Sequence, residues 1–114
     1  MTRPTLTQLA VDVLTTADGH EKTAKSRAAA ALWFASVDEG NPLEIGRAAP
    51  PDRPSRPEVP ELLPPNKVPR RKTGSLRGRV ALLHAIAHIE LNAVDLHWDI
   101  IPRFAHVPMP RGYF

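Results

Sequence analysis

Apolar residues recur three and four positions apart along Leu82–Ile101, the longest amphipathic stretch of the chain. This spacing is that of one face of an α-helix. Ser75 can cap the start of such a helix, and Pro102 should end or kink it. The pattern therefore predicts a long helix over residues 75–104, followed by a loop over residues 105–114. Its apolar face carries Leu83, Ile86, Ala87, Val94 and Ile101.

Two shorter helices are expected near the N-terminus. Residues 5–17 repeat apolar positions at helical spacing, and Thr5 can cap their start. Residues 20–37 are rich in alanine, which has the highest helix propensity. Asp18-Gly19 is a turn signal between the two segments. Together they predict an antiparallel helical hairpin within residues 1–40.

The character of the chain changes over residues 41–74, where proline is concentrated. Each proline fixes its own φ, lacks a backbone donor and pushes the preceding residue towards extended geometry. Neither a helix nor a central strand is expected there. Leucine, isoleucine and valine recur along the segment, which favours a strap wrapped over the helices rather than a free linker. A docking ligand for a proline-binding module is the less favoured alternative. The fold class is thus all-α: hairpin, extended strap, long helix.

The composition excludes several kinds of functional site. The 114 residues suit one small domain, and the absence of cysteine excludes disulfides, thiolate nucleophiles and cysteine-based metal sites. A metal would need nitrogen and oxygen ligands, which favours iron, manganese or zinc. No apolar run is long enough to span a membrane and the N-terminus lacks a signal-peptide pattern, so a cytoplasmic location is expected. The net charge of +3 permits an acidic partner without requiring one.

Glu90 is the unusual residue of the long helix. At about 100° per residue it projects with Leu83 and Val94, on the face that is predicted to be buried. Burying a carboxylate is costly unless it is paired, hydrogen-bonded or bound to a metal. Glu90 is therefore a candidate metal ligand.

His84, His88 and Asp95 form a second stripe on the same helix. Two imidazoles one turn apart can share a divalent ion, as in zinc-binding helices with that spacing. The alternative is that both are ordinary surface or core histidines. Spacing permits a metal site without establishing one.

A basic cluster joins the strap to the long helix. It could contact phosphate groups, or it could be a solvated loop. No aromatic residues alternate with the charges, so the stacking groups of single-strand binders are missing. The cluster comprises Lys67, Arg70, Arg71, Lys72, Arg77 and Arg79.

The phrase IGRAAPPDRPSRPEVPELLPPNKVPRRKTGS and the stretch LLHAIAHIELNAVDLHWDI resemble the N-terminal part of an uncharacterised bacterial family of ferritin-like proteins. That family is related in fold to the tRNA-hydroxylating di-iron enzyme MiaE. The resemblance implies a four-helix bundle around a carboxylate-bridged di-iron centre, in which two helices each give a Glu and two each give a Glu-x-x-His. It makes residues 75–104 the first bundle helix, with Glu90 its iron ligand, and His84 and His88 match positions typical of the family.

The chain also departs from that pattern. Members of the family are longer, and none of the chain's glutamates begins a Glu-x-x-His. The chain therefore looks truncated, and we expect its bundle to be completed by missing C-terminal helices or by a second protomer. The first hypothesis is the N-terminal part of a non-haem di-iron oxidoreductase that is not active alone. The alternatives are a non-catalytic helical assembly module, in which Glu90 pairs with a partner's Arg or Lys, and RNA binding through the Lys67–Arg79 cluster.

Overall fold

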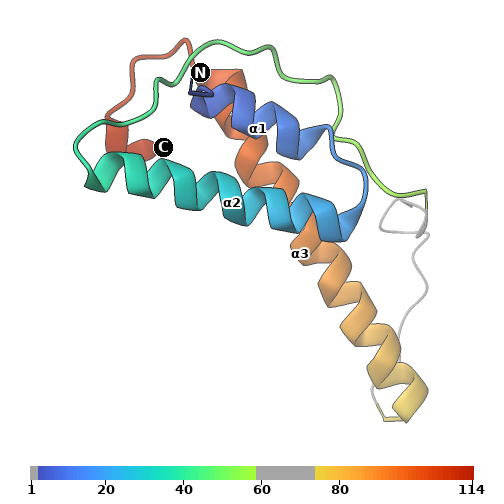
Figure 1. Ribbon diagram of the computed structural model, residues 1–114. Coiled ribbons are helices and arrows are strands. Elements are labelled where there is room, and N and C mark those ends of the chain that lie inside the picture. Colours follow the sequence, from blue (N-terminus) through green and yellow to red (C-terminus); the bar gives the residue numbers. More distant parts are fainter. Residues whose placement is uncertain (1–2, 59–73) are drawn as a thin grey trace.

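The computed structural model describes residues 3–58 and 74–114 of the chain. It contains α1 (Leu6–Leu14), α2 (Gly19–Asp38), α3 (Leu76–Phe104) and a short 3-10 turn, η2 (Arg111–Tyr113). No strand occurs in these residues, so the predicted all-helical class is confirmed. Figure 1 shows α2 running back alongside α1, with α3 crossing the pair and extending well beyond it.

Helix α1 is short and almost enclosed. Thr5 and Gln8 form a capping box at its start, where the Thr5 side chain accepts from Gln8 N at 3.2 Å. The helix ends at Leu14, not at the predicted Ala17. The reason is that the hydroxyl of Thr15 donates to Val11 O at 2.8 Å and that of Thr16 to Asp12 O at 2.7 Å, so side chains satisfy the carbonyls of the last turn.

Helix α2 begins directly at the expected turn. The Asp18 side chain accepts from Glu21 N at 2.9 Å and caps the helix, which starts at Gly19. Gly19 meets Leu91 of α3, and Ser26 accepts from Trp98 Nε1 at 2.7 Å, so α2 and α3 run in the same direction where they touch. The buried cluster Leu6, Trp33 and Leu43 joins α1, α2 and the strap, and Trp98 and Ile101 of α3 pack against it.

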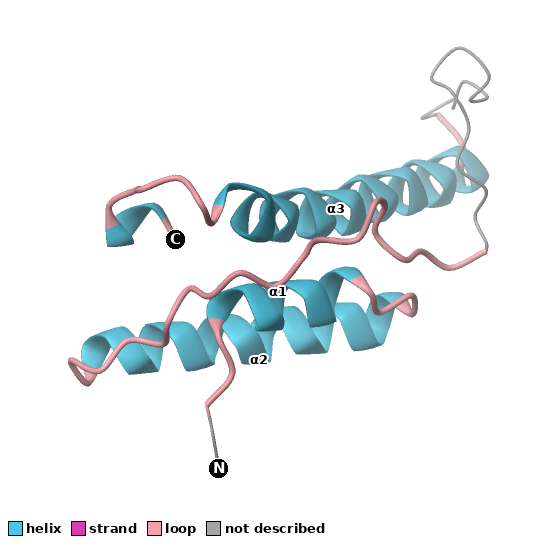
Figure 2. Cartoon of the chain, turned by 90° about the horizontal axis from the view of Figure 1, so that it is seen from above, coloured by secondary structure: helices cyan, strands magenta, loops and turns pink. Residues whose placement is uncertain are grey.

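The first half of the strap wraps around α1. Leu6 N donates to Glu44 O at 2.8 Å and Thr7 N to Ile45 O at 2.9 Å, while Ser55 N donates to Leu14 O at 2.7 Å. A helix leaves its first donors and last acceptors without internal partners, and here the strap supplies partners at both ends. Wrapping is thus confirmed for residues 41–58, and Figure 2 shows this segment crossing over α1. The expectation for residues 59–73 falls outside the described residues.

Helix α3 begins where expected, with the Ser75 side chain accepting from Gly78 N at 3.0 Å. Pro102 does not end it, because a proline in the last turn removes one donor only and the helix continues to Phe104. The tail is not wholly loop, since it contains η2. The C-terminal half of α3 packs on the hairpin, whereas its N-terminal half projects past it (Figure 1).

Candidate functional site

Helix α3 carries all three predicted metal ligands, and two of its faces serve different purposes. One face is a polar stripe that binds the strap and α2. The other is apolar, contains Glu90 and is largely exposed. We call these the strap stripe and the Glu90 face. The Glu90 face is the predicted apolar face with Leu83, Ile86, Ala87, Glu90, Val94 and Ile101. The strap stripe comprises His88, Asn92, Asp95, Asp99 and Arg103.

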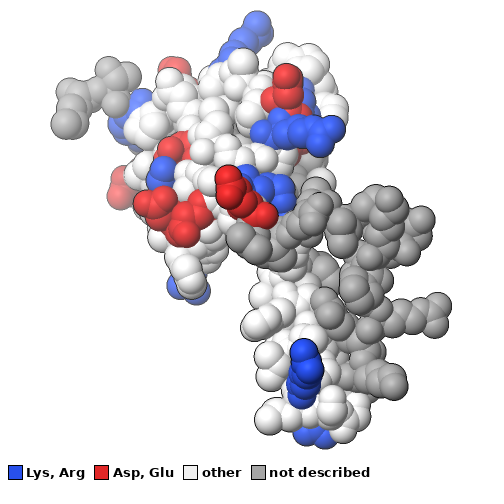
Figure 3. All heavy atoms as spheres, turned by 90° about the vertical axis from the view of Figure 1, so that its right-hand side faces the viewer, with Lys and Arg blue, Asp and Glu red and all other residues white. Residues whose placement is uncertain are grey.

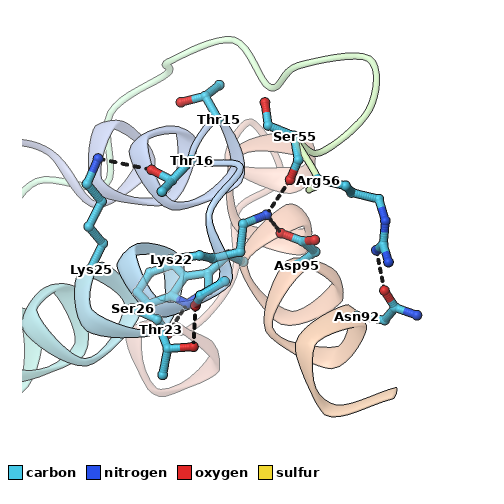
Figure 4. Close-up of polar contacts among 12 residues, drawn as sticks. Thr15, Thr16, Lys22, Thr23, Lys25, Ser26, Ser55, Arg56, Asn92 and Asp95 are labelled. Atoms are coloured by element: carbon cyan, nitrogen blue, oxygen red, sulfur yellow. Dashed lines mark hydrogen bonds and ion pairs between the residues drawn. The ribbon is translucent and has the colours of Figure 1, made fainter. Parts of the chain in front are cut away.

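The centre of the strap stripe is a buried ion pair between Lys22 of α2 and Asp95 (Figure 4). Their side chains are 1% and 6% exposed, and Lys22 Nζ also donates to Ser55 O at 2.8 Å. Asp95 Oδ2 is buried without a hydrogen-bond partner among the described residues. A buried ion pair stabilises the fold little more than apolar residues of similar volume would. Removing one partner, however, leaves the other charge buried and unpaired. The pair therefore fixes the relative positions of α2, α3 and the strap.

Arg56, the next residue of the strap, binds the preceding turn of α3. Its guanidinium donates to Asn92 Oδ1, and its Nη2 lies 2.6 Å from His88 Nε2. A guanidinium has no acceptor, so this contact is a hydrogen bond when Nε2 of His88 is the acceptor, as in the tautomer that carries its proton on Nδ1. In this conformation the Nε2 lone pair of His88 is committed to Arg56 rather than available to a metal.

The far end of the strap stripe is held by Arg103. Its Nε donates to Asp99 Oδ2 at 2.7 Å and its Nη2 to Pro51 O at 2.6 Å. The hydrogen bond that Arg103 donates to the Asp99 carboxylate raises the pKa of Arg103, which keeps the guanidinium charged. The strap thus runs antiparallel to α3, from Arg103 near Pro51 to His88 near Arg56.

Glu90 is exposed, so the expectation that it lies on a buried face is wrong. Leu83 and Ile86 beside it are 64% and 45% exposed. The reason is geometric: α3 packs on the hairpin through other faces, which carry Asp95 and Trp98. The helical period correctly identifies an apolar face. Ile101 at its C-terminal end packs against the core, whereas Leu83 and Ile86 near Glu90 are exposed.

The three predicted metal ligands do not converge. His84 is exposed and lies one turn before His88, whereas Glu90 points about 160° away from His88 around the helix. No group of three or more His, Cys, Asp or Glu suited to a metal occurs among the described residues. The donors in residues 3–58 and 74–114 therefore do not fit a complete di-iron centre.

The Glu90 face continues into an aromatic cleft between α2 and the end of α3. The cleft has a volume of about 460 Å³ and closes at the C-terminal tail. Phe34 is 61% exposed at its rim, and His97 and Ile101 lie two and three turns along α3 from Glu90. The main groups lining it are Trp33, Phe34, His97, Trp98, Ile101 and Tyr113.

Sequence reasoning missed Lys22, Asn92 and Arg56 as partners in the strap stripe. The helical spacing of His84, His88 and Asp95 predicted that these three residues share a face of the helix. It did not predict which residues of the strap and of α2 contact that face. Of the basic cluster, Arg77 and Arg79 are exposed on α3, and the other members lie outside the described residues.

Comparison with known proteins identifies relatives without assigning an activity. The chain is 50% identical over 48 residues to an uncharacterized protein of Haemophilus influenzae (strain ATCC 51907 / DSM 11121 / KW20 / Rd). The match covers 42% of this chain and 17% of that relative, so it spans less than a fifth of the relative's length. No solved structure matches the chain. None of the helices in residues 3–58 and 74–114 has the length and apolar character needed to cross a membrane.

Residues 15–114 match the family described as "Protein of unknown function (DUF455)". The match takes in α2, the strap and α3, and with them every residue of the strap stripe and the Glu90 face. The chain therefore belongs to the DUF455 family.

Proposed function

We propose that this chain supplies the first helix of a ferritin-like bundle, with α3 as that helix and Glu90 as the carboxylate it gives to a non-haem di-iron centre. The remaining bundle helices come from a longer family chain or from a second protomer. In the complete bundle the iron would activate O₂ for an oxidoreductase reaction. The chain alone is not active in this proposal.

The observation that carries the proposal is an exposed carboxylate in the middle of an exposed apolar helix face. Contiguous apolar surface marks a site of association. Once helices cover the face, Glu90 enters an environment where an ionised carboxylate needs a cation or a hydrogen-bond donor. Metal sites of helical bundles are built in this way, from carboxylates that face the core.

The donors near Glu90 would supply only part of an iron site. Glu90 would hold iron through its carboxylate, and Leu83 and Ile86 would exclude water around it. His84 remains a predicted ligand or neighbour of the site, whereas His88 would have to leave Arg56 before it could bind a metal.

The exposed apolar face equally suits a non-catalytic assembly module. In that case Glu90 pairs with an Arg or Lys of the partner and no iron is bound. RNA binding through the Lys67–Arg79 cluster would require a steep dependence of affinity on salt concentration. Of that cluster, Arg77 and Arg79 lie among the described residues, and both are exposed.

The deciding experiment measures iron per chain after anaerobic reconstitution of the purified protein. We expect about one or two irons per pair of chains if protomers complete the bundle. Glu90→Gln should abolish loading, because the amide keeps the shape and removes the charge. Glu39→Gln is the matched control, since Glu39 is an exposed carboxylate at the end of α2. Wild-type loading by the Glu90→Gln variant would refute Glu90 as a ligand, and absence of iron in the wild type would favour the assembly module.

A further inference from the structure

We infer that His88 is an anchor for the strap and not a metal ligand. Its Nε2 atom accepts a hydrogen bond from Arg56, and Arg56, His88 and Asn92 together form a latch that holds one side of α3 against the strap. This role does not depend on any metal and therefore goes beyond the proposed function. It also determines which side of α3 is left for the bundle helices.

The latch is a two-pronged contact across one helical turn. His88 and Asn92 are four residues apart, so their side chains project from the same side of α3. Figure 4 shows Arg56 reaching from the strap to Asn92, where Nη1 donates to Oδ1, and Nη2 lies 2.6 Å from His88 Nε2. A guanidinium carries its donors in a rigid planar fork, which suits two acceptors at this spacing. All three residues are half-buried, so water replaces a lost contact only in part.

The neighbouring residue of the strap brings Arg56 to this position. Ser55 N donates to Leu14 O at 2.7 Å, and Ser55 O accepts from Lys22 Nζ at 2.8 Å. Both backbone groups of Ser55 are thus bound to the hairpin, next to the buried pair of Lys22 and Asp95. The backbone at Arg56 is therefore already held, and mainly its side chain loses freedom when it binds α3.

The surroundings of His88 disfavour a divalent cation. The Arg56 guanidinium lies at hydrogen-bond distance from Nε2 and is always charged, so it repels a metal ion that approaches this atom. The part of α3 before Glu90 carries Arg77 and Arg79 and no carboxylate. Figure 3 shows the described surface of this projecting half as largely uncharged, with basic groups at its tip. Glu90 itself points about 160° away from His88, so it cannot share a metal with that residue.

The latch leaves another side of α3 for further helices. Beyond His88, the strap stripe is bound again at Asp95, which pairs with Lys22, and at Arg103, whose Nη2 donates to Pro51 O at 2.6 Å. The strap and α2 therefore occupy this side over about four helical turns. Bundle helices that cover Glu90 would approach from a different side and would not displace Arg56 from His88.

Nitrogen-15 NMR of the histidine rings tests the contact in the metal-free full chain, above the ordinary pKa range of histidine. We expect the wild-type His88 ring to carry its proton on Nδ1, because the hydrogen bond at one ring nitrogen sets the tautomer. In Arg56→Ala the proton should redistribute between the two nitrogens. A wild-type His88 that is protonated on Nε2 would overturn the latch, because Arg56 would then have no acceptor there.

Urea denaturation in the presence of EDTA tests whether the contact is coupled. His88→Ala should raise the equilibrium constant for unfolding by about 10–100-fold, since a charged donor loses its acceptor. His88→Gln should raise it less than about threefold, because the amide oxygen accepts in place of Nε2. In an Arg56→Ala chain, His88→Ala should also have an effect below about threefold. Equal effects of His88→Ala with and without Arg56 would overturn the latch.

His84→Ala is the matched control for these variants. His84 was predicted as a ligand together with His88, but it is exposed, so its removal should change the unfolding constant less than about threefold. A loss as large as that of His88→Ala would mean that the effect is not specific to the contact with Arg56, and would overturn the anchor role.

Zinc chloride distinguishes a strap anchor from a metal ligand. A metal that binds only the native state stabilises it, so a ligand at residue 88 would make the loss in His88→Gln larger with zinc than with EDTA. We expect the same loss in both. A loss that appears only with zinc would overturn the anchor role. This result is separate from the proposed function: absence of iron in the wild type removes the metal role of Glu90 and leaves the metal-free measurements at His88 unchanged.

Discussion

At the scale of single residues, the most consequential contact is the ion pair between Lys22 and Asp95. Both side chains are almost fully buried, and Ser55 O takes a second hydrogen bond from Lys22. The pair lies where α2, α3 and the strap meet, so a change in either partner affects three segments together. The ion pair of Lys25 and Asp12 is different, because its side chains are 42% and 58% exposed.

This contrast predicts unequal stability losses for two lysine substitutions. Lys22→Ala should reduce the free energy of unfolding by about 3–5 kcal/mol, since it strands the buried Asp95 carboxylate. Lys25→Ala should cost less than about 1 kcal/mol, because water screens and replaces the exposed pair. Urea denaturation followed by circular dichroism measures both. Similar midpoints for the two variants would show that the buried pair does not hold the fold together.

The same contacts show what sequence could not predict at this scale. A lysine in an amphipathic helix is normally expected at the surface, so nothing in the pattern identified Lys22 as buried. The stripe of His84, His88 and Asp95 was recognised as a shared face, but its partner was not. Arg56 lies 32 residues from His88 in the chain, and helical periodicity carries no information about contacts at such separations.

At the scale of elements, the strap provides hydrogen-bond partners for backbone groups of α1 that further helical turns would satisfy in a longer helix. With nine residues α1 is too short to be stable alone, and the strap satisfies backbone groups at both of its ends. The prolines predicted an extended segment because they exclude helix. The path of that segment depends on a tight approach at Gly46, where φ is +75° and a Cβ would lie 2.5 Å from Thr5 Oγ1.

Two glycine substitutions separate the effect of backbone conformation from that of close packing. Gly40→Ala should cost about 1 kcal/mol, because φ is +73° but no atom lies within 4 Å of the added carbon. Gly46→Ala should cost about 1–3 kcal/mol more, since the methyl group also displaces the strap from α1. Thermal unfolding of both variants, compared with the wild type, gives the difference. Equal losses would indicate that the strap adapts freely at Gly46.

At the scale of the whole molecule, the chain is more extended than a compact chain of the same length. Its radius of gyration is 17.0 Å, whereas a compact chain of this length would have about 13 Å. The projecting half of α3 accounts for the excess (Figure 1). Sequence periodicity correctly placed the apolar face along α3. It could not show that the face is uncovered, because a helical period is the same whether the neighbour belongs to the same chain or to another.

The uncovered face leads to a prediction about local stability. In a monomer the projecting half of α3 has little buried contact to hold it, so its amides should exchange with solvent much faster than those near Asp95. Covering of the Glu90 face by further bundle helices, as in the proposed function, should protect both halves. Hydrogen exchange measured by mass spectrometry should therefore show similar protection along α3 in the wild type. In Leu83→Asp, protection should be lost over residues 76–86 and kept near the ion pair. Protection unchanged in that variant would mean that the helix is stable without a partner, and that covering the Glu90 face contributes little to the fold.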